Sequence, residues 1–127
     1  MTHQTVRDWD RALVPTGAGR TAAPDPACPV EAALEAVRGR WTTLVIRELL
    51  HGPRGYREFR RTLPALSDKV LTERLAQLTA LGLAERVETS GFPTRVVYRL
   101  TARGEALRPL MTELYRTGTE LLTTPAR

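Results

Sequence analysis

A short run of side chains between Ser67 and Arg74 combines hydrogen-bond donors, acceptors and charge in a way that suits a nucleic-acid surface. Lysine and arginine reach phosphate oxygens or guanine edges, threonine meets a thymine methyl group, and glutamate accepts a hydrogen bond from cytosine. We therefore expect base-reading and phosphate contacts from Ser67, Lys69, Thr72, Glu73 and Arg74. The alternative is a solvated helix face on which these residues are ordinary surface charges.

Positive charge is concentrated on the N-terminal side of this run. The chain of 127 residues has a net charge of +5, and Lys69 is its only lysine. Residues 1–27 are neutral, with three arginines against three aspartates, so residues 28–127 carry the whole excess. We expect Arg57, Arg60 and Arg61 to hold the phosphate backbone, a contact that positions a protein on DNA without specifying sequence. Arg54 either does the same or holds the turn before them.

The run begins a predicted helix whose opposite side is apolar. Ser67 is a favourable N-cap, and Asp68 in the first turn complements the helix dipole. Leucines at positions 71, 75, 78 and 81 repeat at i, i+4, i+7 and i+10, the spacing of a core face. The helix is expected to end at Leu81-Gly82-Leu83.

Two predicted strands follow this helix directly. Residues 85–89 and 95–100 have the composition of strands, and Ser90-Gly91-Phe92-Pro93 joins them as the tip of a hairpin. A capped helix followed by a hairpin is typical of an α+β winged helix-turn-helix. That fold places one helix in a DNA major groove and the hairpin, or wing, beside the backbone.

The wing supplies two further candidate contacts, Thr94 and Arg95, directly after its tip. An arginine at such a position can enter a narrow minor groove. A strand arginine can instead form an ion pair with a glutamate of the facing strand, here Glu85 or Glu88. The sequence leaves both interpretations open.

Further helices are predicted on both sides of this unit, over residues 29–38, 41–50 and 56–63 and in one long helix after Thr101. Apolar residues at positions 107, 110, 111, 114, 121 and 122 share one side of the last helix. This stripe spans about two heptads, more than a lone terminal helix needs. We expect an arm and linker over residues 1–27, a DNA-binding domain over 28–122 and a tail over 123–127.

Cys28 and Trp41 are candidate effector residues. Cys28 precedes Pro29 at a predicted helix start, where the helix dipole favours a thiolate. The alternative is a small buried apolar residue. As the only cysteine it cannot form an intramolecular disulfide, although a mixed disulfide or a bridge between two subunits remains open. Trp41 is expected in the core with Phe59 and Leu63, with a place in an effector pocket at a dimer interface as its alternative.

Short segments in a fixed order along the chain carry a family resemblance. In the first half they are Cys28-Pro29-Val30, Gly39-Arg40-Trp41-Thr42, Ile46-Arg47-Glu48-Leu49-Leu50, Gly52-Pro53-Arg54, and Phe59 with Leu63. In the second half they are Ser67 with Lys69-Val70-Leu71-Thr72 and Arg74-Leu75, then Leu81-Gly82-Leu83, and Tyr98 with Leu100-Thr101 and Gly104. Together they resemble the HxlR-type transcriptional regulators, relatives of the MarR winged-helix group. The resemblance implies a homodimer, joined through its terminal helices, that binds palindromic operator DNA. It also implies that a cysteine matching Cys28 senses quinones, aldehydes or oxidants in some members. The long arm and Phe92-Pro93 at the wing tip depart from the family pattern.

Motifs for catalysis and for metal binding are absent from the sequence. Ser67 and Ser90 lie outside any Gly-x-Ser-x-Gly turn, His3 and His51 are far apart, and there is no glycine-rich phosphate loop. We therefore expect neither an enzyme nor a metal or cofactor site. No apolar run approaches the roughly 18 residues of a membrane span, and the start does not resemble a signal peptide, which predicts a cytoplasmic protein. The alternative functions are a winged-helix module for protein interaction or for ligand binding alone.

Overall fold

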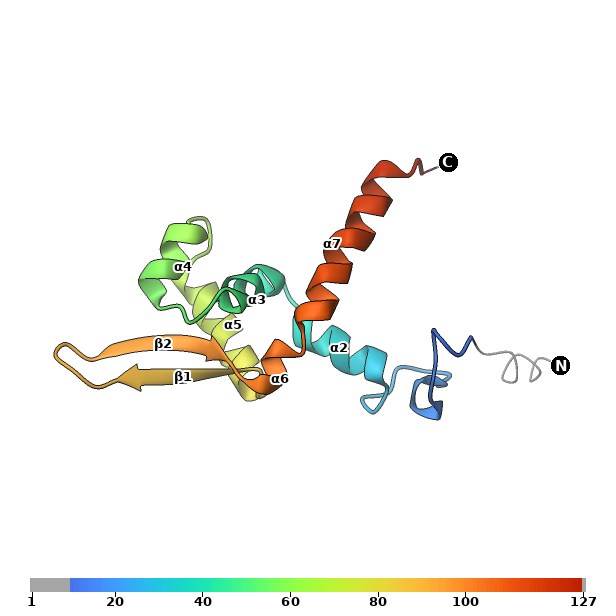
Figure 1. Cartoon of the computed structure of the whole chain (residues 1–127), viewed down its shortest axis with the longest axis horizontal. Helices are drawn as coiled ribbons and strands as arrows, with labels where there is room; N and C mark the ends of the chain where they lie inside the picture. The colour runs from blue at the N-terminus through green and yellow to red at the C-terminus, as the bar shows by residue number, and fades with distance from the viewer. Residues whose placement is uncertain (1–9, 127) are drawn as a thin grey trace. The chain divides into compact units, whose positions relative to one another are not determined.

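The computed structural model describes residues 10–126 of two compact units, Met1–Arg38 and Gly39–Arg127 (Figure 1). In the first unit, η1 is a 3-10 turn at Gly17–Gly19 and α2 spans Pro29–Val37. A proline favours the start of a helix because its missing N–H would have no intrahelical partner there. The predicted arm lies partly outside the described residues, and the domain limits at residues 27/28 and 122/123 stay predictions.

The second unit is the expected α+β winged helix, with the two-stranded hairpin extending away from the helices (Figure 1). Val45, Phe59 and Leu78, from three different helices, are at most 1% exposed and form the centre of the core. The elements are α3 (Thr42–Leu50), α4 (Tyr56–Thr62), α5 (Asp68–Ala80), β1 (Ala84–Thr89), β2 (Arg95–Leu100), α6 (Ala102–Glu105) and α7 (Arg108–Thr123).

The start and the core face of α5 match the sequence prediction. Oγ of Ser67 accepts a hydrogen bond from the N–H of Val70 at 3.2 Å, and Asp68 lies in the first turn. The leucines at the predicted core positions are buried, namely Leu71, Leu75 and Leu78. Leu81 is only half-buried because it caps the C-terminal end of the helix.

Strand β2 is joined both to β1 and to the loop before α4. The two strands pair antiparallel from Ala84 opposite Leu100 to Thr89 opposite Arg95. The N–H of Arg54 donates to the carbonyl oxygen of Tyr98 at 2.9 Å, and the N–H of Tyr98 donates to the carbonyl oxygen of Arg54 at 2.8 Å. This single bridge fixes the start of α4 against the wing.

The prediction of a single helix after Thr101 is wrong, because α6 ends at Glu105 and a separate helix, α7, begins at Arg108. Pro109 has no N–H to bond a carbonyl of the preceding turn, so α6 cannot continue through it. A Cβ on Gly104 would lie 2.0 Å from the carbonyl oxygen of Leu83, so only a glycine lets α6 pack this closely. Within residues 10–126, no helix is long and apolar enough to cross a membrane.

Trp41 also differs from its prediction as a core residue. It is half-buried and caps the N-terminus of α3 with a left-handed φ of +77°, an uncommon backbone conformation for a residue other than glycine. Phe59 and Leu63, predicted in the core with it, are buried. Trp41 therefore lies at the margin of the core and not within it.

Candidate DNA-binding interface

Helix α5 presents a polar side to solvent, opposite its buried leucines. Lys69, Thr72 and Glu73 are all exposed. Residues three and four positions apart are neighbours on a helix surface, so these three side chains share one accessible face. Ser67 is exposed at the start of the same helix, with its Oγ engaged as the N-cap. The structure thus brings together most of the predicted base-reading residues.

Arg60 is exposed at the end of α4, but its guanidinium group already has a partner. It binds the side chain of Asp68, the first residue of α5, across the turn between the two helices. Both side chains are more than 60% exposed. The sequence predicted Arg60 as a phosphate contact and did not predict this pairing, since no helical spacing relates the two positions.

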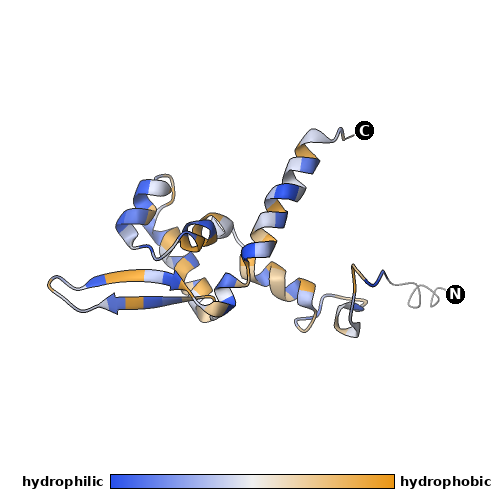
Figure 2. Ribbon diagram, in the orientation of Figure 1, coloured by the Kyte–Doolittle hydropathy of each residue, from blue (hydrophilic) through white to orange (hydrophobic). Residues whose placement is uncertain are grey.

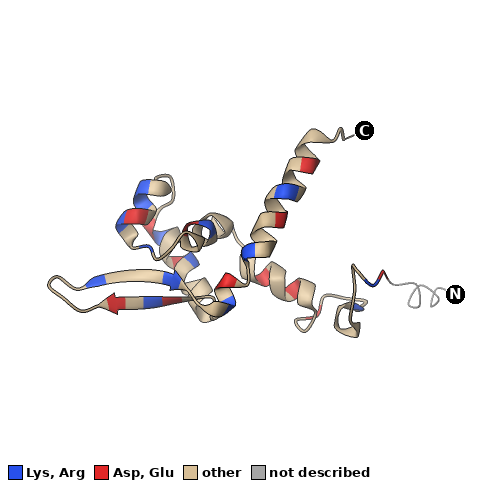
Figure 3. Ribbon diagram, in the orientation of Figure 1, with Lys and Arg blue, Asp and Glu red and all other residues tan. Residues whose placement is uncertain are grey.

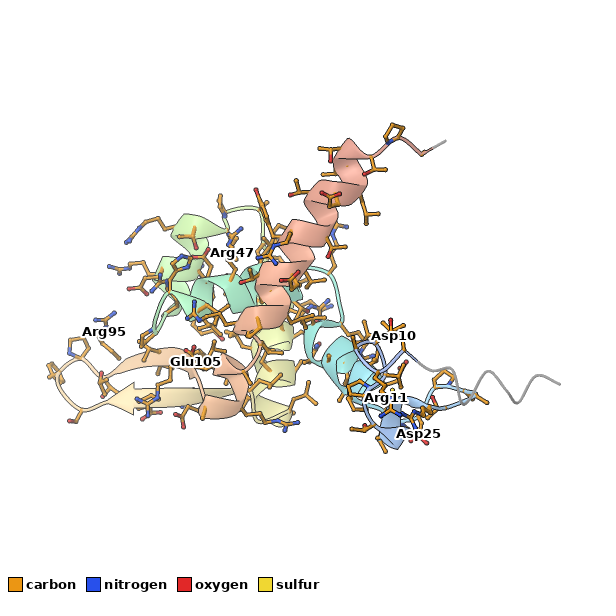
Figure 4. The ribbon with its side chains drawn as sticks, turned by 45° about the vertical axis from the view of Figure 1, so that its right-hand side comes forward. Asp10, Arg11, Asp25, Arg47, Arg95 and Glu105 are labelled. Atoms are coloured by element: carbon orange, nitrogen blue, oxygen red, sulfur yellow. The ribbon has the colours of Figure 1, made fainter. Side chains whose placement is uncertain are left out.

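A hollow of about 540 Å³ lies between the start of α4 and the start of β2. Arg57 and Arg61 line it from α4, one helical turn apart, and Arg95 lines it from the wing. Figure 3 shows basic residues on both elements, and in Figure 4 the labelled Arg95 extends from the wing on the side of α4. Thr94 is exposed beside it. Three predicted backbone or minor-groove contacts therefore line one basic hollow.

Glu58 places a carboxylate among these arginines. Its Oε1 accepts the N–H of Gly55 at 2.9 Å, and its Oε2 lies 3.6 Å from Nη2 of Arg95. The hydrogen bond from Gly55 lowers the pKa of Glu58, with further contributions from the charges of Arg95 and Arg61. Glu58 was not among the residues predicted from the sequence, although a glutamate at the third position of a helix is a recognisable capping signal.

The predicted alternative partners of Arg95 have other partners. Nε of Arg99 donates to Oε2 of Glu85 at 2.8 Å, and Nη1 of Arg86 donates to Oε2 of Glu88 at 2.9 Å. Of the alternatives left open for Arg95, the structure does not show an ion pair with Glu85 or Glu88, and Glu58 is its partner instead. The partner comes from α4 because β2 runs along the start of that helix.

Arg54 and Arg74 both hold backbone turns. Nη1 of Arg54 donates to the carbonyl oxygen of Pro53 at 3.0 Å, and its Nε lies 4.0 Å from Oε1 of the buried Glu48. Nε of Arg74 donates to the carbonyl oxygen of Arg40 at 2.7 Å, in the turn before α3. Of the two roles left open for Arg54, the structure shows the one in the turn. Contact of either arginine with DNA stays a prediction.

An exposed polar helix face, a basic hollow and a wing in one unit are the parts with which a winged helix-turn-helix meets DNA. The model of the HxlR-like helix-turn-helix family matches residues 36–125. The chain belongs to this family. It is 37% identical over 94 residues to the HTH-type transcriptional regulator YvaP of Bacillus subtilis strain 168. The match covers 73% of this chain and 87% of YvaP. The resemblance in the sequence is thereby confirmed, and the chain is a DNA-binding transcriptional regulator.

Two solved structures resemble this HxlR-like chain in fold and sequence. The reduced form of YodB from Bacillus subtilis is 32% identical with a TM-score of 0.68, and the match covers 79% of this chain and 98% of YodB. The redox regulator HypR in its oxidised form is 31% identical with a TM-score of 0.66, and the match covers 73% of this chain and 96% of HypR. Both similarities agree with the winged-helix fold.

In this HxlR-like chain, Cys28 is buried and caps the N-terminus of α2. It is 5% exposed, and its N–H donates to the carbonyl oxygen of Asp25 at 2.8 Å. Burial agrees with the predicted alternative of a small packed residue, and the sensing role stays a prediction. A place for Trp41 in an effector pocket likewise stays a prediction.

Proposed function

We propose that the regulator is a homodimer that binds a palindromic operator with one α5 helix from each subunit. The observation that carries the proposal is the exposed face of Lys69, Thr72 and Glu73 beside the basic hollow. A two-fold axis would place the two helices in successive major grooves, about 34–36 Å apart. Because the target is chromosomal DNA, we also propose a cytoplasmic location.

The basic hollow supports a contact with the phosphate backbone. Arg57, Arg61 and Arg95 bring three guanidinium groups to it, and Glu58 brings one carboxylate, so the surface keeps a net positive charge. The planar fork of an arginine matches the oxygens of a phosphate group. In this arrangement the wing, with Arg95, lies beside the minor groove while α5 lies in the major groove.

The exposed apolar side of α7 supports the homodimer. Leu114 is 44% exposed and Tyr115 82%, while Leu121 and Leu122 are 73% and 90% exposed. Figure 2 shows apolar residues recurring along this helix. Exposed apolar patches of this kind mark interaction sites. A second copy of α7 would cover this patch in the way that the family resemblance implies.

Exposed apolar side chains on α2 give the same indication in the first unit. Val30 and Leu34 are 58% and 55% exposed. Burying side chains of this size stabilises an interface by about 25 cal/mol for each Å² of apolar surface removed from water. We propose that α2 also contributes apolar surface to the contact between the two subunits.

Fluorescence anisotropy with DNA from the region upstream of the protein's own gene tests the DNA contact. Affinity should fall steeply between about 50 and 200 mM salt, because phosphate contacts release counterions. Arg57→Glu together with Arg61→Glu should abolish specific binding, while Arg11→Glu with Arg20→Glu makes the same charge change outside the hollow and should preserve it. Unchanged affinity of the hollow variant would contradict the proposal and favour a protein-interaction or ligand-binding module.

We further propose that Cys28 makes DNA binding responsive to oxidants or electrophiles. HypR is named a redox regulator, and YodB has been solved in a reduced and in a diamide-treated form. In this chain, two Cys28 thiols of a dimer would lose two electrons and two protons to diamide, which becomes the hydrazine, and a disulfide would form between them. Cys28→Ser should abolish the effect of diamide on DNA binding. An unchanged response would exclude Cys28 as the sensor.

A further inference from the structure

Tyr56 is the first residue of α4 and contacts both α5 and the wing. Its hydroxyl oxygen lies 3.4 Å from Oγ1 of Thr72 in α5. Its ring meets the ring of Tyr98 in β2 edge to face, with centroids 6.2 Å apart and planes at 88°. The ring contact therefore fixes the phenol from the wing side, while its hydroxyl points to the exposed face of α5.

The two hydroxyl groups are neighbours without being strongly bonded to each other. Strong O–H···O hydrogen bonds have oxygen separations of about 2.7–2.8 Å, so the contact at 3.4 Å is weak and can be exchanged for a stronger acceptor. Thr72 is exposed and Tyr56 is half-buried, so the pair is open to solvent on one side. An acceptor that binds both hydroxyl groups would replace this weak contact.

The surroundings of the pair favour an anionic acceptor. Tyr56 lines the basic hollow together with Arg57, Arg61 and Arg95. Lys69 lies three positions before Thr72 and thus on the same side of α5. Positive charge on two sides of a pair of neutral donors fits a non-bridging phosphate oxygen better than an uncharged group.

We propose that the hydroxyl groups of Tyr56 and Thr72 together bind one DNA phosphate, at the point where the basic hollow meets α5. This inference rests on the proposed contact of α5 with DNA. Hydroxyl side chains are ordinary phosphate ligands in protein–DNA complexes. With its Oγ1 engaged in this way, Thr72 keeps its methyl group for a thymine methyl. The shared phosphate fixes how deeply α5 enters the major groove.

Tyr56→Phe tests the proposal because it removes the hydroxyl and keeps the ring against Tyr98. Affinity should fall about tenfold on operator DNA and by the same factor on DNA of unrelated sequence, since a phosphate carries no base information. The salt dependence should stay unchanged, because a neutral donor releases no counterion. Thr123→Val removes an exposed hydroxyl from the end of α7, away from the apolar patch, and should bind like the wild type.

Ethylation interference identifies the phosphate. One phosphate in each half-site should interfere with wild-type binding when ethylated, and should cease to interfere in Tyr56→Phe and in Thr72→Val. An unchanged interference pattern, wild-type affinity of Tyr56→Phe, or a change of base preference in that variant would overturn the proposal. If the wild-type protein bound neither operator DNA nor DNA of unrelated sequence, the proposed function would be overturned, and this inference with it. Circular dichroism of each variant confirms that the fold is intact.

Discussion

Arg60 of α4 and Asp68 of α5 are joined by two side-chain hydrogen bonds, from Nε to Oδ1 at 3.1 Å and from Nη2 to Oδ2 at 2.7 Å. The hydrogen bond to Asp68 raises the pKa of Arg60. The carboxylate also complements the dipole at the start of α5. Both effects concern the free protein. In the proposed complex with DNA, the same carboxylate, one residue before Lys69, would repel a phosphate group.

Asp68→Asn should therefore strengthen DNA binding by a few-fold and steepen its salt dependence by about one unit, because it releases Arg60 for a phosphate. The melting temperature should change little, since an exposed ion pair contributes little to stability. Anisotropy titrations at several salt concentrations measure both quantities. Glu113→Gln, which releases Arg116 of α7 from a similar pair, is the matched control. Weaker binding by Asp68→Asn would show that the pair itself is needed on DNA.

The capping carboxylate of Glu58 predicts a pH-dependent contribution to stability. Its pKa in the folded protein is lowered from the ordinary 4.5, first of all by the N–H of Gly55. A lowered folded pKa means that Glu58 stabilises the fold above the unfolded pKa, and that this contribution is lost as pH falls through the folded pKa. Glu58→Gln should therefore melt below the wild type at pH 7, and the difference should shrink as the pH falls through the folded pKa.

Thermal denaturation followed by circular dichroism, at pH 7 and in a series of buffers of decreasing pH, measures this contribution. Glu120→Gln removes one exposed carboxylate from α7 and controls for the general change in charge. A difference between wild type and Glu58→Gln that persists undiminished at low pH would show that packing around the side chain, and not its charge, is responsible.

Local patterns were sufficient to predict α5 and the wing. The spacing of Leu71, Leu75 and Leu78 alone defines a buried helix face, and the cap at Ser67 depends only on residues three positions away. The break before α7 was also present in the sequence as Pro109. It was missed because the apolar stripe continues through it, and a periodic pattern does not reveal a change of helix direction.

Contacts between elements could not be predicted in the same way. Arg95 pairs with Glu58 only because a single bridge between Arg54 and Tyr98 brings β2 beside α4. The sequence shows the charges of this pair but not their separation in space. For the same reason, the sequence does not show that Tyr56 is a neighbour of α5.

Substitution by alanine should change the free energy of unfolding in opposite directions at Gly104, in α6, and at Gly118, in α7. At Gly104 the new Cβ would meet the carbonyl oxygen of Leu83 at 2.0 Å, so Gly104→Ala should lower the free energy of unfolding by more than about 2 kcal/mol. At Gly118 no atom lies within 4 Å of the added Cβ. Gly118→Ala should raise the free energy of unfolding by about 0.5–1 kcal/mol, because alanine restricts the unfolded chain and favours helix.

Urea denaturation at one fixed protein concentration measures both changes, since the stability of a dimer depends on concentration. Wild-type stability of Gly104→Ala would contradict the close packing of α6 on Leu83. Destabilisation by Gly118→Ala would indicate that Gly118 is needed at the surface of α7, as a close approach between two copies of that helix would require.

The exposed side of α7 gives the sharpest test of the homodimer. Leu121→Glu with Leu122→Glu should convert the dimer to a monomer, because it buries charge in the proposed interface. The monomer should keep its fold, since these side chains are already 73% and 90% exposed. Analytical ultracentrifugation measures the mass, and affinity for a palindromic site should fall toward that for a single half-site. Arg116→Glu introduces the same side chain two residues after Leu114, on the opposite side of the helix, and should remain a dimer. A leucine variant that still sediments as a dimer would place the interface elsewhere on the chain.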